Sequence, residues 1–393
     1  MKQIVIVGGG FAGVRTARKL SRLKSVSVTL VNDGPDFRYC PALYRAATGF
    51  KLGTARLPLE WMLLDSANTD LVIGRAKTIN MQKKYIELDD STKLQYDYAV
   101  LALGSVTTYF NIEGLHEHAF GIKTAEEVTE LRRHLHQSLT EKSHIERNYV
   151  IVGAGPSGVE LAGALGTYLQ RITKKHRIKK HGIKIWLIEA APRILPQMNP
   201  RASKSTTKHL TKLGVKVAVN TTVKSETIKS LKTSAGNIIT HTVIWTAGTS
   251  NNEFFKNNAD QFSFSERNRI VVDSHLQARP DVYVIGDNAA TKYSGTALTA
   301  VWHGNFTGKD IIARITHKRR PVKYESHPIT VVPAGKNWAV MQYRGIVLHG
   351  RPISWLRKAA DFVGYSDVLG ILRAMTVWTN SEKPETPCST CRR

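Results

Sequence analysis

The N-terminal residues show the pattern of apolar and polar positions that is typical of a strand, a turn, a helix and a second strand. Residues 3–7 (QIVIV) form a nearly continuous apolar run, which predicts a strand buried in a parallel sheet. Gly8–Gly10 follow, and a helical stretch continues to Leu23. The run VSVTLVN at 26–32 predicts the next strand, so the chain opens with a βαβ unit.

The same pattern returns further along the chain. The segment TAEEVTELRRHLHQSL predicts a helix with Thr124 as its N-cap and acidic residues in its first turn. NYVIVGAGPSGVELAGAL at 148–165 then repeats the strand, the glycine turn and the helix, and IKIWLIE at 183–189 supplies the second strand. The chain therefore contains an internal duplication.

The remaining segments are predicted from the same periodicity. Further strands that end in turns are expected at 96–105, 241–248 and 281–289. Residues 38–65 are predicted to be irregular and 71–90 to form a small antiparallel element. After about residue 320 we expect β-structure, then apolar and aromatic positions at helical spacing over 353–378, and finally a disordered polar tail.

The first glycine motif, GGGFAG at 8–13, follows a strand and opens a helix, which is the context in which GxGxxG indicates a dinucleotide site. Its glycines allow a tight turn and close approach of the backbone to a pyrophosphate, which the helix N-terminus then binds. An acid that binds a ribose is expected at the end of the second strand. Asn32 stands there, with Asp33 next, and Asn still hydrogen-bonds a hydroxyl, so we expect a weakened but functional site.

The second motif runs from Gly153 through Gly155 and Gly158 to Glu160, and its second strand ends in Glu189. A carboxylate at that position accepts the 2′-hydroxyl of an adenosine ribose and repels a 2′-phosphate. The motif therefore predicts NADH in preference to NADPH. The alternatives are a solvent-exposed strand end at Glu189 and a contribution from the basic residues near it in the sequence, Lys184 and Arg193.

Other strand-to-turn junctions follow in a fixed order. They are Ala102-Leu-Gly104-Ser105, Thr246-Ala-Gly248 and Gly286-Asp287. An Asp directly after a strand and a glycine is suited to bind a ribityl or pyrophosphate oxygen. Each junction alone is ordinary, and only their order along one chain has diagnostic value.

This order resembles that of the two-dinucleotide-binding-domain flavoproteins with the glutathione-reductase-like fold, and within them the type II NADH dehydrogenases, the single-subunit NADH:quinone oxidoreductases. The resemblance covers about residues 1–315, and the C-terminal region resembles that of the family more loosely. It rests on GGGFAG at 8–13, PALYRAATG at 41–49, LALGS at 101–105, VGAGPSGVELAG at 152–163, WLIE at 186–189, WTAG at 245–248 and VIGDNA at 284–289.

The resemblance implies an α/β fold with two Rossmann-like domains and a C-terminal amphipathic, membrane-associating region. The expected divisions are an FAD-binding domain in two parts (1–115 and 271–325), an NADH-binding domain (116–270), a C-terminal region of β-structure and amphipathic helices (326–380) and a polar tail (381–393). Implied FAD contacts are Gly8, Gly10, Phe11, Ala12, Gly13, Asn32, Ala102, Gly104, Gly286 and Asp287. Implied NADH contacts are Gly153, Gly155, Gly158, Glu160, Glu189 and Gly248.

The implied reaction is hydride transfer from NADH to FAD and electron transfer onward to a membrane quinone, without a metal. Glu160 would lie near the nicotinamide, where it orients the ring or assists proton transfer. The chain departs from the family at a pair of glutamines beside the flavin and the quinone. Leu298, Trp302 and His303 stand in that stretch and are the acceptor-site candidates. Trp and His stack on and hydrogen-bond a quinone ring, and packing against the flavin is the alternative role of His303.

This departure keeps other functions open. One is a soluble NAD(P)H-dependent flavoprotein reductase whose acceptor is a protein, a thiol or dioxygen. Another is a nucleic-acid-binding or redox-sensing protein with a structural FAD, which the intact NADH motif disfavours. Cys40 lies in a region that approaches the flavin in related folds, and we expect a buried, small apolar residue there rather than a redox thiolate. Cys388 and Cys391 have CxxC spacing but no second pair, so we expect no metal site.

The net charge of +25 favours an anionic surface, and no apolar stretch reaches the roughly 20 residues that span a bilayer. With no signal-peptide pattern and only three cysteines, the expected location is peripheral, on the cytoplasmic face of the membrane. The segment 353–378 would lie in the interface, with Arg357, Lys358 and Arg373 at the headgroups. The alternatives are a helix pair docked on the protein body and a homodimer interface.

Overall fold

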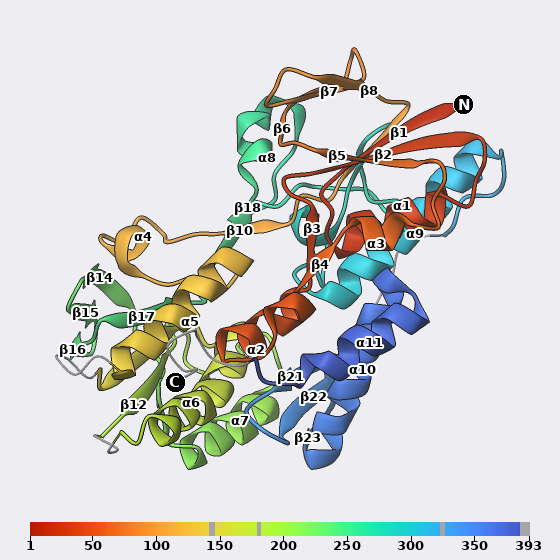
Figure 1. Ribbon diagram of the computed structural model, residues 1–393. Coiled ribbons are helices and arrows are strands. Elements are labelled where there is room, and N and C mark those ends of the chain that lie inside the picture. The colour runs from red at the N-terminus through yellow and green to blue at the C-terminus, as the bar shows by residue number, and fades with distance from the viewer. Residues whose placement is uncertain (141–145, 179–181, 323–326, 386–393) are drawn as a thin grey trace.

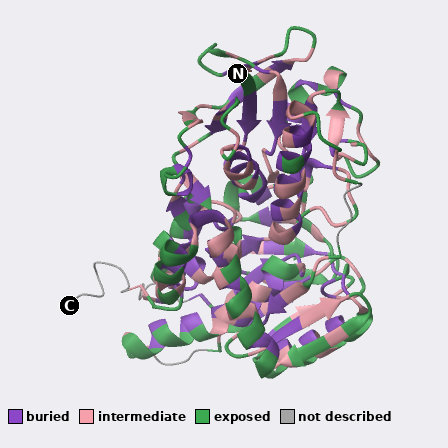
Figure 2. Ribbon diagram, turned by 90° about the vertical axis from the view of Figure 1, so that its right-hand side faces the viewer, coloured by how far each residue is buried: buried purple, intermediate pink, exposed green. Residues whose placement is uncertain are grey.

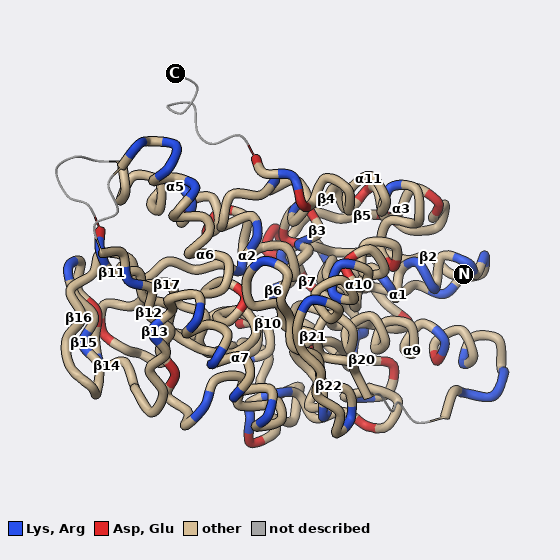
Figure 3. Tube along the Cα trace, turned by 90° about the horizontal axis from the view of Figure 1, so that it is seen from below, with Lys and Arg blue, Asp and Glu red and all other residues tan. Residues whose placement is uncertain are grey.

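The computed structural model describes residues 1–140, 146–178, 182–322 and 327–385. Two parallel sheets lie at opposite ends of an elongated molecule, and the C-terminal helices run along the side between them (Figure 1). The burial colouring shows the strands as the interior of each end, with helices and loops around them (Figure 2). Lys and Arg occur on elements of both ends, so the excess positive charge is spread over the molecule (Figure 3).

The larger sheet has the strand order β19-β20-β9-β1-β2-β5, and every pairing except β19 with β20 is parallel. Its strands are β1 (Lys2–Val7), β2 (Val26–Asn32), β5 (Thr69–Ile73), β9 (Tyr98–Leu101), β19 (Gln277–Arg279) and β20 (Val282–Val284). Helices α1 (Phe11–Leu20) and α9 (Ala297–Ile315) pack together in one core with this sheet. A side chain at Gly304 of α9 would collide with the Ala12 carbonyl, so this glycine allows the two helices their close approach.

The smaller parallel sheet has the order β13-β12-β11-β17. Its strands are β11 (Asn148–Val152), β12 (Lys184–Ile188), β13 (Val215–Ala218) and β17 (Thr242–Trp245), and its helices are α5 (Ala125–Thr140), α6 (Pro156–Lys175) and α7 (Pro200–Lys212). The predicted N-cap is confirmed: the Thr124 hydroxyl accepts the Glu127 N–H at 3.1 Å, and the Glu127 carboxylate accepts the Thr124 N–H at 3.2 Å.

Small antiparallel elements complete both ends. They are β3 (Asp36–Arg38) with β4 (Arg56–Pro58); β6 (Ala76–Asn80), β7 (Tyr85–Leu88) and β8 (Lys93–Gln95); β10 (Ser105–Thr107) with β18 (Thr249–Asn251); and β14 (Val223–Thr227), β15 (Ser230–Thr233) and β16 (Gly236–Ile239). Short helices are α2 (Leu43–Ala47), α3 (Glu60–Leu63), α4 (Leu115–His118) and α8 (Glu253–Asn257). The prediction of an irregular 38–65 was therefore wrong in part, since helices of only one or two turns leave too short a periodic signal. Residues 71–73 belong to the parallel sheet and not to the small antiparallel one.

The C-terminal region has the predicted β-structure, β21 (Thr330–Pro333), β22 (Ala339–Tyr343) and β23 (Ile346–Gly350), followed by helices α10 (Arg351–Leu369) and α11 (Ile371–Ser381). Arg15 and Arg18 of α1 donate to the Asp367 carbonyl at 3.2 and 3.0 Å and so fix the end of α10 on the larger sheet's helices. No helix within the described part of the chain is long and apolar enough to cross a bilayer.

Part of the expected disordered tail is structured. Pro384 forms an isolated β-bridge with Phe50, and the Glu385 carboxylate pairs with Arg132 of α5. The prediction of a disordered tail was thus wrong for 381–385, because a bridge and an ion pair compensate for the polar composition. The CxxC at 388–391 lies outside the described residues.

Candidate active site

The first glycine loop lies at the carboxyl end of β1, directly before α1. A side chain at Gly8 would collide with the Ala102 carbonyl, and one at Gly13 would collide with the Gly8 carbonyl. At Gly10, by contrast, nothing lies within 4 Å of the position that a Cβ would take. The loop is therefore packed tightly below and open above the N-terminus of α1, which is the shape that a pyrophosphate requires.

Asn32, at the end of β2, lies against this loop as predicted. Its side-chain oxygen accepts the Gly9 N–H at 2.7 Å, and its amide donates to the Gly34 carbonyl at 2.7 Å. The oxygen has a second lone pair for a ribose hydroxyl. The residue that replaces the expected acid therefore still supports the loop, without a charge.

The other predicted FAD-binding turns meet at the same edge, because β1, β9 and β20 are neighbours and parallel. The Asp287 carboxylate accepts a hydrogen bond from the Ser105 hydroxyl at 3.0 Å, and the Asn288 amide donates to the Gly104 carbonyl at 2.8 Å. Gly286 has a positive φ of 72°, which turns the chain sharply after β20. Sequence segments nearly two hundred residues apart thus form one site.

The second glycine loop repeats this construction after β11. A side chain at Gly158 would collide with the Gly153 carbonyl. At Gly155 nothing lies within 4 Å of the position that a Cβ would take. The Glu189 carboxylate, just past β12, accepts the Ala154 N–H at 2.7 Å and the Ala191 N–H at 2.9 Å. Glu189 is thus held at the loop and is not merely a solvent-exposed strand end.

The two basic residues near Glu189 in the sequence, Lys184 and Arg193, form no hydrogen bond with its carboxylate within the described part of the chain. Lys184 begins β12, at the opposite end of that strand from Glu189. Arg193 donates to the carbonyls of Leu195 and Met198 at 3.0 and 2.6 Å, within its own loop. Gly248, after β17, has a φ of 73° and lies against the Phe110 ring.

The acceptor-site candidates on α9 lie on different sides of the helix. Leu298 and Trp302 are one turn apart and half-buried. His303 is fully buried, and its Nδ1 accepts the Gly286 N–H at 3.0 Å. Burial lowers the pKa of His303 to about 4, so the ring is neutral near pH 7. His303 therefore supports the turn that carries Asp287, a contact that its position in the sequence does not reveal.

Cys40 is exposed, so the expectation of a buried small residue was wrong. Although the residue reaches the surface, neighbouring protein atoms still desolvate the thiol, and together with the Asp287 carboxylate they raise its pKa, which opposes a reactive thiolate. Lys123 lies in the same charged neighbourhood, and its buried ammonium has no hydrogen-bond partner within the described residues. Burial lowers the pKa of Lys123, against the opposing effect of Asp287. No sequence pattern had indicated Lys123.

A buried cluster of charges joins α2 and α10. Arg45 of α2 donates to one oxygen of Asp361 at 2.9 Å, and Arg357 pairs with the other oxygen of that carboxylate. The exposed fractions of the side chains are 2% for Asp361 and 13% for each arginine. The placement of Arg357 at lipid headgroups was therefore wrong, because its partner Asp361 lies one helical turn away on the inner face of α10.

Glu160, near the start of α6, lies within the electrostatic reach of this cluster. Burial raises the pKa of the Glu160 carboxyl to about 7, although Arg357 and Arg45 oppose that rise. The Tyr39 hydroxyl donates to the Asp361 carbonyl at 3.2 Å, and its ring stacks on Tyr365 at a centroid distance of 4.0 Å. A carboxyl that titrates near neutral pH thus lies close to the charged residues of α2 and α10.

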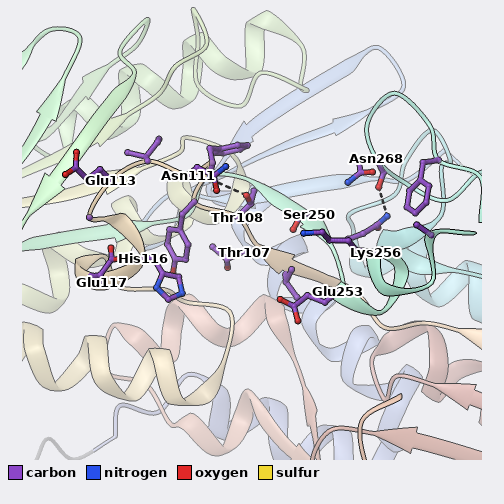
Figure 4. A pocket seen from close by; sticks show the side chains of 18 residues that line it. Thr107, Thr108, Asn111, Glu113, His116, Glu117, Ser250, Glu253, Lys256 and Asn268 are labelled. Carbon is purple, nitrogen blue, oxygen red and sulfur yellow. Dashed lines mark hydrogen bonds between the residues drawn. The ribbon is translucent and has the colours of Figure 1, made fainter. Parts of the chain in front are cut away.

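A separate cavity of about 940 Å³ lies beside the β10–β18 connection. His116, Glu113 and Glu117 line it toward the smaller sheet, and Glu253, Lys256 and Asn268 toward the larger one (Figure 4). None of the predicted site residues lines this cavity. Within the described residues, no group of three or more His, Cys, Asp or Glu side chains is arranged to hold a metal ion.

Two parallel sheets that each present an open glycine loop at the carboxyl edge define a protein of the two-dinucleotide-binding-domain class. The family model for pyridine nucleotide-disulphide oxidoreductases matches residues 2–304, and the chain belongs to that family. The predicted α/β fold with two Rossmann-like domains is therefore confirmed.

The similar proteins also confirm the resemblance that the motif order indicated. A type II NADH:quinone oxidoreductase of Mycobacterium tuberculosis is 26% identical over 350 residues, which are 82% of this chain and 75% of that protein. One of Staphylococcus epidermidis is 24% identical, covering 92% and 94%. Among solved structures, NDH2 of Plasmodium falciparum in complex with NADH superposes with a TM-score of 0.86 at 16% identity, covering 98% and 99%. The sulfide:quinone oxidoreductase of Aquifex aeolicus has a TM-score of 0.79 at 19% identity, covering 100% and 98%.

Proposed function

We propose that this protein is an FAD-dependent NADH:quinone oxidoreductase of the type II NADH dehydrogenase kind. The observation that carries the proposal is the pair of glycine loops of equivalent construction, each open above a helix N-terminus and each supported by the side chain that ends the second strand. The relatives that match most of the chain are themselves named type II NADH:quinone oxidoreductases, which agrees with this proposal.

The chain fits both cofactors. FAD would be held by the loop at Gly8–Gly13, by Asn32 and by the Asp287 turn, since the open space at Gly10 accepts a pyrophosphate. NADH would be held by the loop at Gly153–Gly158 with Glu189 at the adenosine ribose. When bound, FAD accepts a hydride from the nicotinamide and supplies electrons for the acceptor. The chain's own contribution is to position both rings, to exclude water and to hold a proton at Glu160.

The acceptor site is proposed to include Leu298 and Trp302 of α9 and Glu160 of α6. Leu298 and Trp302 offer apolar and aromatic surface in place of the family's glutamines. A quinone ring requires such a slot with one or two polar groups. Glu160, with a pKa of about 7, both donates and regains a proton near neutral pH.

We further propose that the protein is peripheral on the cytoplasmic face of the membrane. Large apolar side chains of α10 and α11 are exposed, and α3 adds two more; they are Trp355, Leu356, Val363, Ile371, Leu372 and Met375, with Trp61 and Leu64. Such a patch at the surface of a basic protein suits an anionic bilayer. The predicted interfacial segment 353–378 does not contribute throughout, since Leu369 within it is buried in the body. A homodimer interface is the competing use of this patch.

Anaerobic titration of the purified yellow protein with NADH, followed by a short-chain quinone, tests the proposed reaction. NADH is expected to bleach the flavin absorbance and quinone to restore it within the turnover time. Bleaching without reoxidation by quinone contradicts the proposal. It would favour a soluble reductase with a protein, thiol or dioxygen acceptor, in agreement with the Leu298 and Trp302 departures.

A further inference from the structure

Arg45 is a buried cation whose hydrogen-bonding groups are only partly used. Its Nη1 donates to Asp361 at 2.9 Å. Its Nε and Nη2 are also buried, and within the described residues neither has a hydrogen-bond partner. An unpaired buried donor is costly, and that cost is higher for a charged group. The fork of Arg45 therefore has free N–H groups for an acceptor that no side chain of the described residues supplies.

The balance of charge in the cluster points to the same kind of ligand. Asp361 neutralises only one of the two arginines that contact it. The remaining neighbour is Glu160, whose raised pKa leaves it largely protonated below pH 7. Burial acts to lower the pKa of Arg45, but Asp361 outweighs that effect and the pKa is raised, so Arg45 is always charged. A positive charge thus stays buried, and a group that becomes negative during the reaction would be stabilised beside it.

The position of the cluster suits a lipid-soluble acceptor. Arg357 and Asp361 face inward from α10, while Trp355 and Val363 of the same helix are 70% and 58% exposed. The cluster therefore lies on the inner side of the helix whose outer side carries exposed apolar residues. Leu298, in the stretch where the family has glutamines, carries no hydrogen-bond donor, so we expect a second element to supply one to the acceptor.

We propose that Arg45 binds a carbonyl oxygen of the quinone, and that Asp361 and Arg357 position it for that contact. This inference rests on the proposed function. In the overall reaction NADH, one proton and the quinone become NAD⁺ and the hydroquinone, so NADH loses a hydride and the protein supplies one further proton. Negative charge develops on the carbonyl oxygen as electrons arrive, the free N–H groups of Arg45 stabilise it, and Glu160 donates the proton and regains one from water.

The test is Arg45→Met in the FAD-loaded protein, because this variant removes the free donors and leaves the Arg357–Asp361 pair neutral and intact. We expect bleaching by NADH and reoxidation by ferricyanide, which needs no carbonyl contact, to proceed as in the wild type. Reoxidation by a short-chain quinone should fall roughly 10- to 100-fold, as expected for a lost hydrogen bond to a charged group. Equilibrium dialysis of the same quinone against the oxidised protein, without NADH, should show weaker binding.

Arg171→Met is the matched control. Arg171 of α6 donates to the Thr48 carbonyl at 2.7 Å, just after α2, and is exposed, so its loss perturbs the same neighbourhood without touching the proposed acceptor contact. Arg45→Lys is the second variant, since an ammonium keeps the pair with Asp361 but lacks the rigid fork. We expect weaker quinone binding in Arg45→Lys, in the same direction as in Arg45→Met.

Quinone binding and reoxidation at wild-type levels in both Arg45 variants would overturn the inference. A parallel fall in the quinone and ferricyanide rates, with loss of FAD, would also overturn it by assigning Arg45 a structural role. A wild-type protein that NADH bleaches and quinone does not reoxidise would instead refute the proposed function itself, so the two failures are distinguishable.

Discussion

The side-chain oxygen of Asn32 accepts the Gly9 N–H at 2.7 Å, the same contact and length by which Glu189 accepts the Ala154 N–H. The two loops thus share one construction, with a neutral amide in the first and a carboxylate in the second. Asn32→Ala should leave the Gly9 N–H unpaired, at a cost of about 1–3 kcal/mol, and lower the FAD content. Asn32→Asp keeps the acceptor and should retain more FAD. The ratio of flavin absorbance to protein measures this, and equal FAD content in both variants would contradict it.

Glu189 is expected to discriminate between NADH and NADPH. Glu189→Gln keeps an acceptor for the ribose hydroxyl and removes the charge that repels a 2′-phosphate. The NADPH-to-NADH ratio of kcat/KM should therefore rise by about 10- to 100-fold, because like charges in contact cost a few kcal/mol. Asn32→Asp serves as the control, since it changes a charge at the other loop. An unchanged ratio in Glu189→Gln would remove Glu189 from the ribose site.

His303 is expected to make the fold sensitive to acid. Its pKa is lowered to about 4 by burial, and the ring accepts the Gly286 N–H only in its neutral form. Because the folded-state value lies below the unfolded one, its contribution to stability is complete above the ordinary histidine pKa and is lost as the pH falls through about 4. His303→Leu should lower the free energy of unfolding by about 1–3 kcal/mol at neutral pH. It should also make that free energy fall less steeply with decreasing pH. Denaturant unfolding at several pH values measures both effects.

The control for His303 is a histidine that is exposed. His118→Leu at the end of α4 removes such a side chain, and its unfolding curve should follow the wild type. If the free energy of unfolding of His303→Leu falls with decreasing pH as steeply as that of the wild type, other groups cause the acid sensitivity. FAD content, measured on the same samples, separates a local effect on the Asp287 turn from global unfolding.

Glu160 is expected to set the pH dependence of the acceptor half-reaction. The groups that act on it are Arg357, Asp361 and Arg45. Because the carboxyl donates a proton only below its pKa of about 7, reoxidation by quinone should slow as the pH rises through that value. Glu160→Gln should remove this inflection and leave bleaching by NADH nearly unchanged in its pH profile. Stopped-flow rates over a pH series test this, and a retained inflection would point to another proton donor.

The exposed patch of α10 and α11 is expected to bind anionic vesicles. Leu372, which is 85% exposed, should lose membrane binding on change to Glu. Ile239→Glu is the matched control, because Ile239 is 71% exposed on β16, in the antiparallel β14–β16 sheet and outside the patch. Sedimentation with phosphatidylglycerol vesicles measures binding. If the wild type does not sediment with the vesicles but elutes as a dimer, and Leu372→Glu elutes as a monomer, the patch is a homodimer interface instead.

Sequence patterns predicted most of the fold, because buried parallel strands and glycine turns leave local signals. They predicted the position of Glu189 for the same reason, since the residue after a second strand necessarily lies beside the first turn. They missed the Arg45–Asp361–Arg357 cluster, whose members are single charged residues on helices far apart in sequence. The charge pattern of 353–378 even suggested the opposite for Arg357, because periodicity does not distinguish an inward ion pair from a snorkelling arginine.

The pairing of α10 with α2 through Asp361 joins a C-terminal helix to the N-terminal part of the chain. The residues proposed to hold both dinucleotides come from the first three hundred or so, while α10, which positions Arg45 in the proposed acceptor site, comes after them. A lineage could thus exchange one oxidant for another by altering the last helices and the residues they meet, and leave the use of the reductant unchanged.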